Sequence, residues 1–276
     1  MIFAQFQGGL GNQLFQYALG ASLAKLNKTN LQAEVSYYFI VKNRQFVLDK
    51  LGLHIDQPPL FSHPLLTPLH VPRIQKDWLK LLDATHMYGL RYVCEEKQFF
   101  FDKNIFSQRG NLLLSGFWQH LKYIEPIQTE LRSDLGRQLK KLSPHSVGIH
   151  IRRTDYVTSS AFEACSVDYY KQSIRFLTQR GIKPKFYVFS DDPIWVRQNM
   201  RLPRGTVYVS EQGLHDWEEF QILASCKHII MANSTFSWWA AWVGGDKDRI
   251  VIMPKNWSST NPGATFALHY TKWLLL

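Results

Sequence analysis

The residues best suited to chemistry are the consecutive His150-Ile151-Arg152-Arg153-Thr154-Asp155, which follow the apolar run 146–149. A short apolar run with β-branched residues predicts a buried strand at 147–151, so the arginines lie at its carboxyl end. In open α/β sheets, ligands bind just beyond the carboxyl ends of the strands. Two guanidinium groups there would bind a phosphate or diphosphate through paired hydrogen bonds, and Asp155 could accept a proton beside that anion. The alternative is a solvated strand end with a local Arg–Asp pair.

Three further apolar runs in the second half also end in polar clusters, which are Ser190-Asp191-Asp192, Ser210-Glu211 and Asn233-Ser234-Thr235-Phe236-Ser237. Strands that alternate with helices predict a parallel sheet, so these ends share one edge. The run 233–237 precedes a predicted helix and offers hydroxyl groups and free amides to a phosphate, unless it is an ordinary helix cap. Asp191-Asp192 is either a metal pair or the acidic start of a helix.

The chain opens with a strand predicted at 1–7, a glycine-rich turn, Gly8-Gly9-Leu10-Gly11-Asn12, and a helix predicted from Gln13 to about Leu26. Free amides at such a helix start attract anions. The turn is not the dinucleotide-binding fingerprint, because Leu14 stands where a third glycine is required.

The elements between and beyond these motifs predict two domains, 1–143 and 144–276. Prolines make 56–73 a loop, amphipathic spacing predicts a helix at 77–90, and a strand is expected at 111–117. A charged helix at 125–142 ends at Ser143-Pro144, which we interpret as the boundary. The second half then predicts strands at 147–151, 185–189, 206–209, 228–231 and 250–253, and helices at 167–179, 193–200, 217–225 and 238–243.

Composition narrows the class of protein. The 276 residues are 45% hydrophobic and carry a net charge of +10, which points to an anionic partner: nucleotide phosphates, nucleic acid or a membrane surface. Basic residues are spread along the chain without a nucleic-acid-binding motif, which argues against nucleic acid. Three cysteines without close spacing form neither a zinc pattern nor a disulfide framework, which fits a reducing cytoplasm. No stretch approaches the ~20 apolar residues of a membrane span.

Four motifs together resemble the α-1,2-fucosyltransferase family, whose members are mostly bacterial. They occur in the expected order and approximate spacing from residue 2 to about 257, and they are Gly8 to Tyr17, the HIRRTD stretch, Phe189-Ser190-Asp191-Asp192, and NSTFSWWAAW at 233–242.

The resemblance implies a GT-B fold of α/β class, with two Rossmann-like domains facing across a cleft. It implies an inverting transferase that moves L-fucose from GDP-β-L-fucose to the 2-hydroxyl of a galactose without an obligatory metal. Arg152 would bind the β-phosphate. The other residues that the resemblance places around the donor are His150, Arg153, Asp155, Ser190, Asp191 or Asp192, Asp216, Asn233, Ser234, Thr235 and Ser237, with Gly9, Gly11, Asn12 and Gln13 facing it from the other domain.

The chemistry of sugar transfer agrees with this picture. Breaking the C1–O bond leaves negative charge on the diphosphate, which Arg152 and helix-start amides could neutralise in place of a metal. Inversion also requires a base for the proton of the acceptor hydroxyl. Asp155 is the first candidate and Glu163 the second, and the sequence does not choose between them.

Two alternatives stay open: a metal-independent GT-B transferase for another nucleotide sugar, and a nucleic-acid-binding module. The acceptor is not readable from the sequence. A lipid-linked acceptor would place the protein at the inner face of the membrane, where the helix at 77–90, with Trp78 and Tyr88, could touch lipid or instead pack against its own domain.

Overall fold

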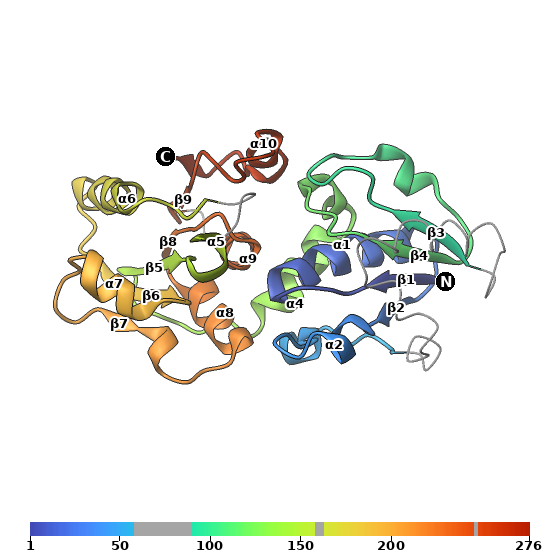
Figure 1. Ribbon diagram of the computed structural model, residues 1–276, viewed down its shortest axis with the longest axis horizontal. Helices are drawn as coiled ribbons and strands as arrows, with labels where there is room; N and C mark the ends of the chain where they lie inside the picture. The colour runs from blue at the N-terminus through green and yellow to red at the C-terminus, as the bar shows by residue number, and fades with distance from the viewer. Residues whose placement is uncertain (58–89, 158–162, 246–247) are drawn as a thin grey trace. The chain divides into compact units, whose positions relative to one another are not determined.

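The structure is a computed structural model that describes residues 1–57, 90–157, 163–245 and 248–276. The chain divides into two units, Met1–Leu131 and Arg132–Leu276 (Figure 1). We call them unit 1 and unit 2. The division falls inside a helix, and the domain boundary placed at residue 143 stays a prediction. The loop at 58–73 and nearly all of the helix predicted at 77–90 lie outside the described residues.

Unit 1 is built on a four-stranded parallel sheet in the order β2-β1-β4-β3. The strands are β1 (Ile2–Gln5), β2 (Leu31–Glu34), β3 (Arg91–Cys94) and β4 (Leu112–Ser115). β1 and β4, the two central strands, are buried throughout. Leu19 and Leu23 of the first helix close the core against Ile2 and Leu112.

That helix, α1 (Leu10–Leu26), begins three residues earlier than predicted. The Gly9 carbonyl accepts hydrogen bonds from the amides of Asn12 and Gln13, so Gly11 and Asn12 belong to the first helical turn. The other helices in the described part of unit 1 are short: α2 (Tyr37–Ile40), η1 (Leu48–Leu51), η5 (Lys103–Ser107), η6 (Leu121–Tyr123) and η7 (Glu125–Ile127). The long helix predicted at 125–142 is wrong in extent, because η7 is followed only by α4 (Gln128–Gly136).

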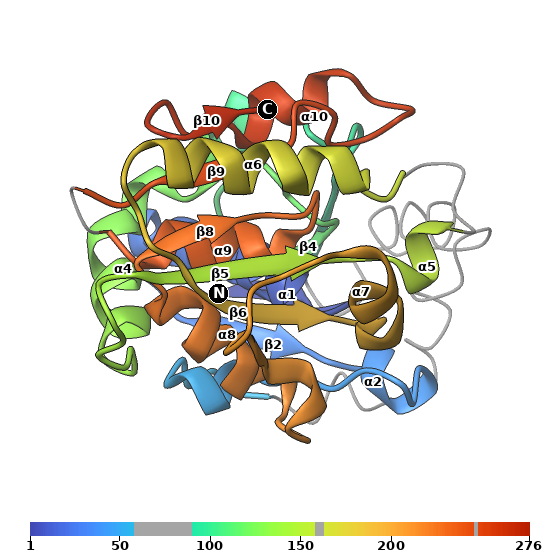
Figure 2. The same ribbon diagram turned by 90° about the vertical axis from the view of Figure 1, so that its left-hand side faces the viewer.

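Unit 2 is built on a six-stranded parallel sheet in the order β10-β9-β8-β5-β6-β7 (Figure 2). The strands are β5 (Ser146–Ile151), β6 (Lys185–Ser190), β7 (Val207–Tyr208), β8 (His228–Ile230), β9 (Val251–Met253) and β10 (Leu274–Leu275). The helices are α5 (Thr154–Val157), α6 (Val167–Gln179), α7 (Pro193–Asn199), η8 (Val209–Glu211), α8 (Asp216–Ser225), α9 (Thr235–Val243) and α10 (Gly263–Leu268).

The two faces of β5 pack differently, as strand alternation requires. Val147, Ile149 and Ile151 share a hydrophobic core with residues of α6 and α7. On the other face, a Cβ at Gly148 would lie 2.5 Å from Leu223 of α8, so only glycine allows that approach. The α/β class, with a Rossmann-like parallel sheet in each half of the chain, is therefore confirmed.

Most of the tryptophans in unit 2 pack into its core. Trp238, Trp239 and Trp242 of α9 are buried, and Trp238 packs edge-on against Trp273 at 5.5 Å between ring centroids. In the described part of the chain, no helix is both long and apolar enough to cross a bilayer.

Candidate functional site

The parallel register of β5 and β6 brings the ends of two predicted motifs together. Ile151 pairs with Ser190, so the residues that follow, Arg152 and Asp191, lie side by side. Arg152 Nε is 3.2 Å from Asp191 Oδ2, and the two side chains are 21% and 17% exposed. Arg152 is thus held in place by an ion pair while it stays accessible to an anion.

The same Asp191 carboxylate organises the turn that leaves β5. Its Oδ1 accepts the backbone amide of Arg153 at 2.9 Å, and its Oδ2 accepts the amide and hydroxyl of Thr154 at 3.2 and 2.6 Å. Both oxygens of this carboxylate are thus engaged by donors of the turn. Asp191 therefore acts as the anchor of the arginine turn.

Arg153 is fixed by α7. Its guanidinium lies 3.6 Å from the centroid of the Trp195 ring, and its Nε is 3.5 Å from Asp192 Oδ2. Asp192 also caps α7 by accepting the Trp195 amide, and its own amide donates to Ser190 Oγ. Asp192 and Ser190 thus shape the turn. Among the described residues, no group of three or more His, Cys, Asp or Glu side chains could hold a metal.

His150 lies on the face of β5 that α9 covers. The imidazole is 6% exposed, and its centroid is 5.3 Å from that of the Phe236 ring. Burial, together with the charge of Arg152, lowers the pKa of His150 to about 3. The ring is therefore neutral at physiological pH. Its Nδ1 has no hydrogen-bond partner within the described part of the chain.

The start of α9 combines a fixed framework with an open cap. Asn233 is 1% exposed, and its amide donates to the carbonyls of Glu163 and Trp257. Ser237 Oγ donates to the carbonyls of Ala232 and Ser234. Ser234 is the N-cap residue, and its side chain makes no capping hydrogen bond. The first amides of a helix have no intrahelical acceptors, so this start can bind an anion. Thr235 is the first residue of α9.

Tyr156 joins the arginine turn to the start of α9, and sequence reasoning missed it. Its hydroxyl donates to the Asn233 carbonyl at 3.0 Å, and Arg152 Cζ lies 5.9 Å from the centroid of its ring. A tyrosine directly after a predicted site residue is not recognisable as functional from the sequence, because its hydrogen-bond partner is 77 residues away.

A second missed residue is Glu219 of α8. Its Oε2 accepts the Ser210 hydroxyl at 3.0 Å, and Ser210 Oγ accepts the backbone amide of Ser190. Burial, opposed by the Ser210 hydrogen bond, raises the pKa of Glu219 to about 7, and the charge of Asp216 adds to the rise. The predicted Asp216 is exposed at the first turn of α8.

In unit 1, the glycine turn is held by amide side chains. Gln13 is fully buried: its Nε2 donates to the carbonyls of Gly8 and Gln45, and its Oε1 accepts the Val47 amide. Asn12 Oδ1 accepts from Gln119 Nε2 at 2.9 Å. The Gln13 side chain is thus engaged inside unit 1, and the donor contacts of Gly9, Gly11, Asn12 and Gln13 stay predictions.

The two candidate bases are placed only in part. Asp155 lies in α5, and its side chain is outside the described part of the structure. Glu163 is exposed, and its backbone carbonyl accepts the Asn233 amide.

Comparisons with known proteins agree with the motifs. The model of glycosyl transferase family 11 matches residues 1–274. An alpha-1,2-colitosyltransferase of Escherichia coli is 29% identical over 292 residues, which cover 99% of this chain and 98% of that protein. A galactoside alpha-(1,2)-fucosyltransferase 1 of Saimiri sciureus is 28% identical over 266 residues, which cover 86% of this chain and 64% of the relative.

Among solved structures, the chain is similar to fucosyltransferase NodZ from Bradyrhizobium, with a TM-score of 0.42 and 14% identity over 87% of this chain and 91% of that one. The family match spans nearly the whole sequence and includes all four motifs. The protein therefore belongs to glycosyl transferase family 11, the α-1,2-fucosyltransferase family, and is a glycosyltransferase.

Proposed function

We propose that the protein transfers L-fucose from GDP-β-L-fucose to the 2-hydroxyl of a galactose in a glycan, with inversion at the fucose C1. The observation that carries the proposal is the anchored Arg152, whose guanidinium is paired with Asp191 and whose neighbour Tyr156 bonds to the residue before the N-cap of α9. This arrangement sets a fixed positive charge near a helix start, as binding of a diphosphate requires.

In the proposed reaction, the bond between the fucose C1 and the diphosphate oxygen breaks as the galactose 2-hydroxyl oxygen bonds to C1. Negative charge then develops on the departing GDP. Arg152 and the first amides of α9 stabilise that charge because the Asp191 pair and the helix hold them in place before the reaction. The proton of the acceptor hydroxyl goes to a carboxylate, for which Asp155 is the first candidate and Glu163 the second.

A second donor is favoured by one observation, the similarity to a protein named alpha-1,2-colitosyltransferase over 99% of this chain. Colitose is fucose that lacks the 3-hydroxyl, so a GDP-colitose donor would differ from GDP-fucose in one polar contact. A site that hydrogen-bonds the 3-hydroxyl of fucose would discriminate strongly against GDP-colitose, because the analogue leaves a buried polar group without a partner.

The deciding experiment is thermal unfolding of the full chain with GDP-fucose, GDP-colitose, GDP-mannose and UDP-galactose, followed by transfer assays with lactose. A donor that binds the folded state raises the melting temperature by mass action. We expect GDP-fucose to give the largest shift and a fucosylated product at the galactose 2-hydroxyl. A larger shift and faster transfer with GDP-colitose would reassign the donor, and a response to UDP-galactose alone would refute the GDP-sugar proposal.

We also propose that transfer needs no metal, because Arg152 and the α9 amides supply the positive charge. Activity should therefore be unchanged in excess EDTA. Loss of activity on chelation, restored by Mn²⁺ or Mg²⁺, would contradict this part of the proposal.

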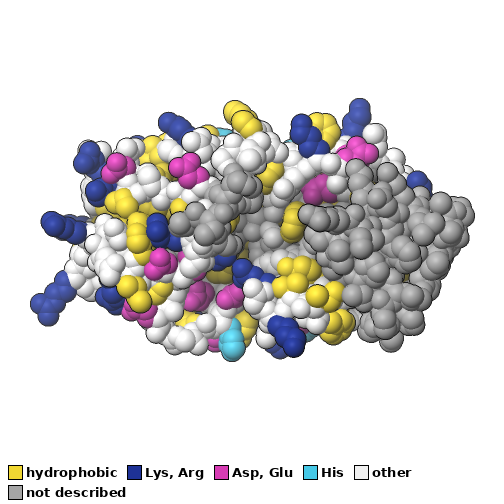
Figure 3. Space-filling model, in the orientation of Figure 1, with side chains coloured by type: hydrophobic (Ala, Val, Ile, Leu, Met, Phe, Trp, Pro, Cys, Tyr) yellow, Lys and Arg dark blue, Asp and Glu magenta, His cyan; other side chains and the backbone are white. Residues whose placement is uncertain are grey.

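The three cysteines are free thiols, which supports a cytoplasmic location, and a lipid-linked acceptor would bring the protein to the membrane surface. On the visible face of unit 2, basic side chains are interspersed with acidic ones rather than gathered in one patch, which supports a nucleotide sugar over nucleic acid as the anionic partner (Figure 3).

A further inference from the structure

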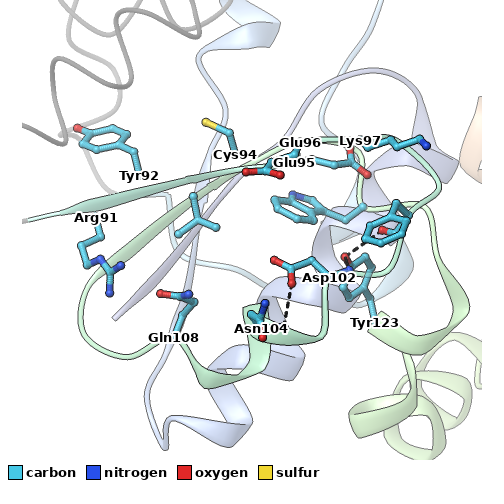
Figure 4. Close-up of a pocket in the computed structure, with 13 residues that line it drawn as sticks. Arg91, Tyr92, Cys94, Glu95, Glu96, Lys97, Asp102, Asn104, Gln108 and Tyr123 are labelled. Carbon is cyan, nitrogen blue, oxygen red and sulfur yellow. Dashed lines mark hydrogen bonds between the residues drawn. The ribbon is translucent and has the colours of Figure 1, made fainter.

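A pocket of about 620 Å³ lies within unit 1, between β3 and the segment 102–108 (Figure 4). Its volume is in the range of ~300–1,000 Å³ that is typical of sites for small organic ligands. Of the described residues, none from the arginine turn, the start of α9 or the glycine turn lines it. The pocket is therefore a separate feature from the candidate donor site.

Two buried polar atoms of residues that line this pocket have no hydrogen-bond partner within the described part of the chain. They are Trp118 Nε1, on a side chain only 3% exposed, and Glu95 Oε1. Leaving such a group without a partner costs ~1–3 kcal/mol. A ligand hydroxyl, which both donates and accepts, can satisfy a buried N–H and a buried carboxylate oxygen alike.

The wall that carries Trp118 is specifically built. Glu95 Oε2 accepts the Phe117 amide at 2.8 Å, which leaves Oε1 as the atom without a partner. A Cβ at Gly116 would lie 2.4 Å from Glu95 Cβ, so the turn requires glycine there. Trp118 has φ 56, a left-handed conformation that is rare and costly for a bulky residue. The backbone is therefore strained at a residue that lines the pocket.

The charges of the pocket favour a neutral ligand over a phosphate. Three carboxylates, Glu95, Glu96 and Asp102, line it beside two cations, Arg91 and Lys97, and Glu95 and Asp102 lie on opposite sides of it (Figure 4). Of these five side chains, only Glu95 is not exposed. Burial raises the pKa of Glu95, since the charged form loses hydration. Aromatic rings of Tyr92, Phe100 and Tyr123 also line it. Aromatic faces combined with carboxyl groups suit the apolar faces and hydroxyls of a sugar.

We propose that this pocket is a saccharide subsite, which binds a neutral sugar residue of the acceptor glycan other than the galactose that is fucosylated. The proposal rests on the proposed function for the identity of the glycan as acceptor. Gln119, the residue after Trp118, donates to Asn12 of the glycine turn at 2.9 Å. The pocket wall and the glycine turn are thus adjacent within unit 1, as a chain of linked sugars requires.

The test compares acceptors of different length on the full-length protein. Trp118→Phe removes the indole N–H. Glu95→Gln replaces the free carboxylate oxygen with an NH₂ group, which cannot accept a hydrogen bond, and keeps a carbonyl oxygen that can accept the Phe117 amide. With GDP-fucose as donor, each should raise KM for lacto-N-tetraose about three- to tenfold, the equivalent of one lost hydrogen bond. KM for methyl β-galactoside and for GDP-fucose should stay at the wild-type value.

Glu125→Gln is the matched control, because Glu125 is exposed and outside the pocket lining. Asp102→Asn, on the exposed wall, keeps the comparison measurable if both buried variants unfold, and it should likewise raise KM for the tetrasaccharide alone. Equal changes for short and long acceptors, or no change in any folded variant, would overturn the subsite.

Direct binding separates this proposal from the proposed function. If the wild-type protein transfers no fucose, calorimetric titration with lacto-N-tetraose still tests the pocket. Binding that is lost in the pocket variants and kept in Glu125→Gln supports the subsite, whereas absence of binding to the wild-type protein refutes it.

Discussion

The turns after β1 and after β5 follow central strands of their sheets, yet they are built from opposite chemistry. After β5, charged side chains remain partly accessible, as the 21% exposure of Arg152 shows. After β1, neutral amides are buried, and Gln13 is fully inaccessible. The arginine turn, which we call the charged turn, is suited to neutralising a leaving group. The glycine turn, which we call the amide turn, fixes the path of the backbone. The turns after β1 and β5 therefore have different roles, although they occupy equivalent positions in two similar sheets.

Removing Arg152 should have the largest effect. We expect Arg152→Ala to lower kcat/KM by about 10²–10³ or more while the protein stays folded, because one preorganised charge donor is lost. Arg152→Lys should also be poor, since an ammonium cannot reproduce the fork of a guanidinium. Steady-state kinetics with GDP-fucose, beside the melting temperature, measures this. Turnover near the wild-type rate in Arg152→Lys would contradict the paired-bond role.

Asp155→Asn should have the second largest effect, and it tests whether Asp155 accepts the proton of the acceptor hydroxyl. If Asp155 is the base, kcat should fall about 10²–10⁴-fold while GDP binds as before, because an amide cannot accept that proton. Calorimetry with GDP beside kcat measures both quantities. Weaker GDP binding instead would make Asp155 a residue that orients the arginines. An unchanged kcat would eliminate it and move the test to Glu163→Gln.

Gln13→Met probes the amide turn and should act on stability. The change leaves the Val47 amide and the Gln45 carbonyl without their partner, so the free energy of unfolding should fall by about 1–3 kcal/mol. Urea denaturation measures this, with the Kd for GDP expected unchanged. Lost donor binding at unchanged stability would reverse the comparison and confirm the predicted donor contact of Gln13.

Glu219→Gln should have the smallest effect, and that effect is on stability. Glu219 accepts the Ser210 hydroxyl, which in turn accepts the amide of Ser190 beside the charged turn. The pKa of Glu219 is raised from 4.5 to about 7, so the folded state holds a proton that the unfolded state releases. This group's contribution to stability is present below pH 4.5 and is lost as the pH rises through 7. Glu219→Gln should flatten the decline of the melting temperature over this range. An unaltered pH profile would show that Glu219 does not titrate there.

The local sequence pattern predicts some helices and strands correctly and misses others. The amphipathic helix at 167–179 was predicted with the bounds that the structure has, and the buried strand after Ser143-Pro144 was also confirmed. β2 and β3 were missed, because LQAE and RYVC are short and carry no alternating pattern. The start of α1 was misplaced because glycines, which disfavour helix interiors, are tolerated in its first turn.

The candidate site likewise contains residues that the sequence predicts and residues that it does not. The motifs at 150–155 and 190–192 lie together because parallel strands in register bring their ends to one edge, which a sequence pattern can predict. Tyr156, Glu219 and Trp118 could not be predicted, since each depends on a partner chosen by tertiary packing. The turn that carries Trp118, for example, is held by the carboxylate of Glu95, the residue that follows β3.

One feature of α9 bears on how the family could diversify. In the proposed function its first turn binds the diphosphate, while its later turns carry Trp238, Trp239 and Trp242, which are buried in the interior. Such large packed rings resist displacement, so the start of α9 keeps its position when residues around it are substituted. Substitutions near the sugar can then accumulate without repacking the core. One scaffold could in this way retain its nucleotide and exchange the sugar that it transfers.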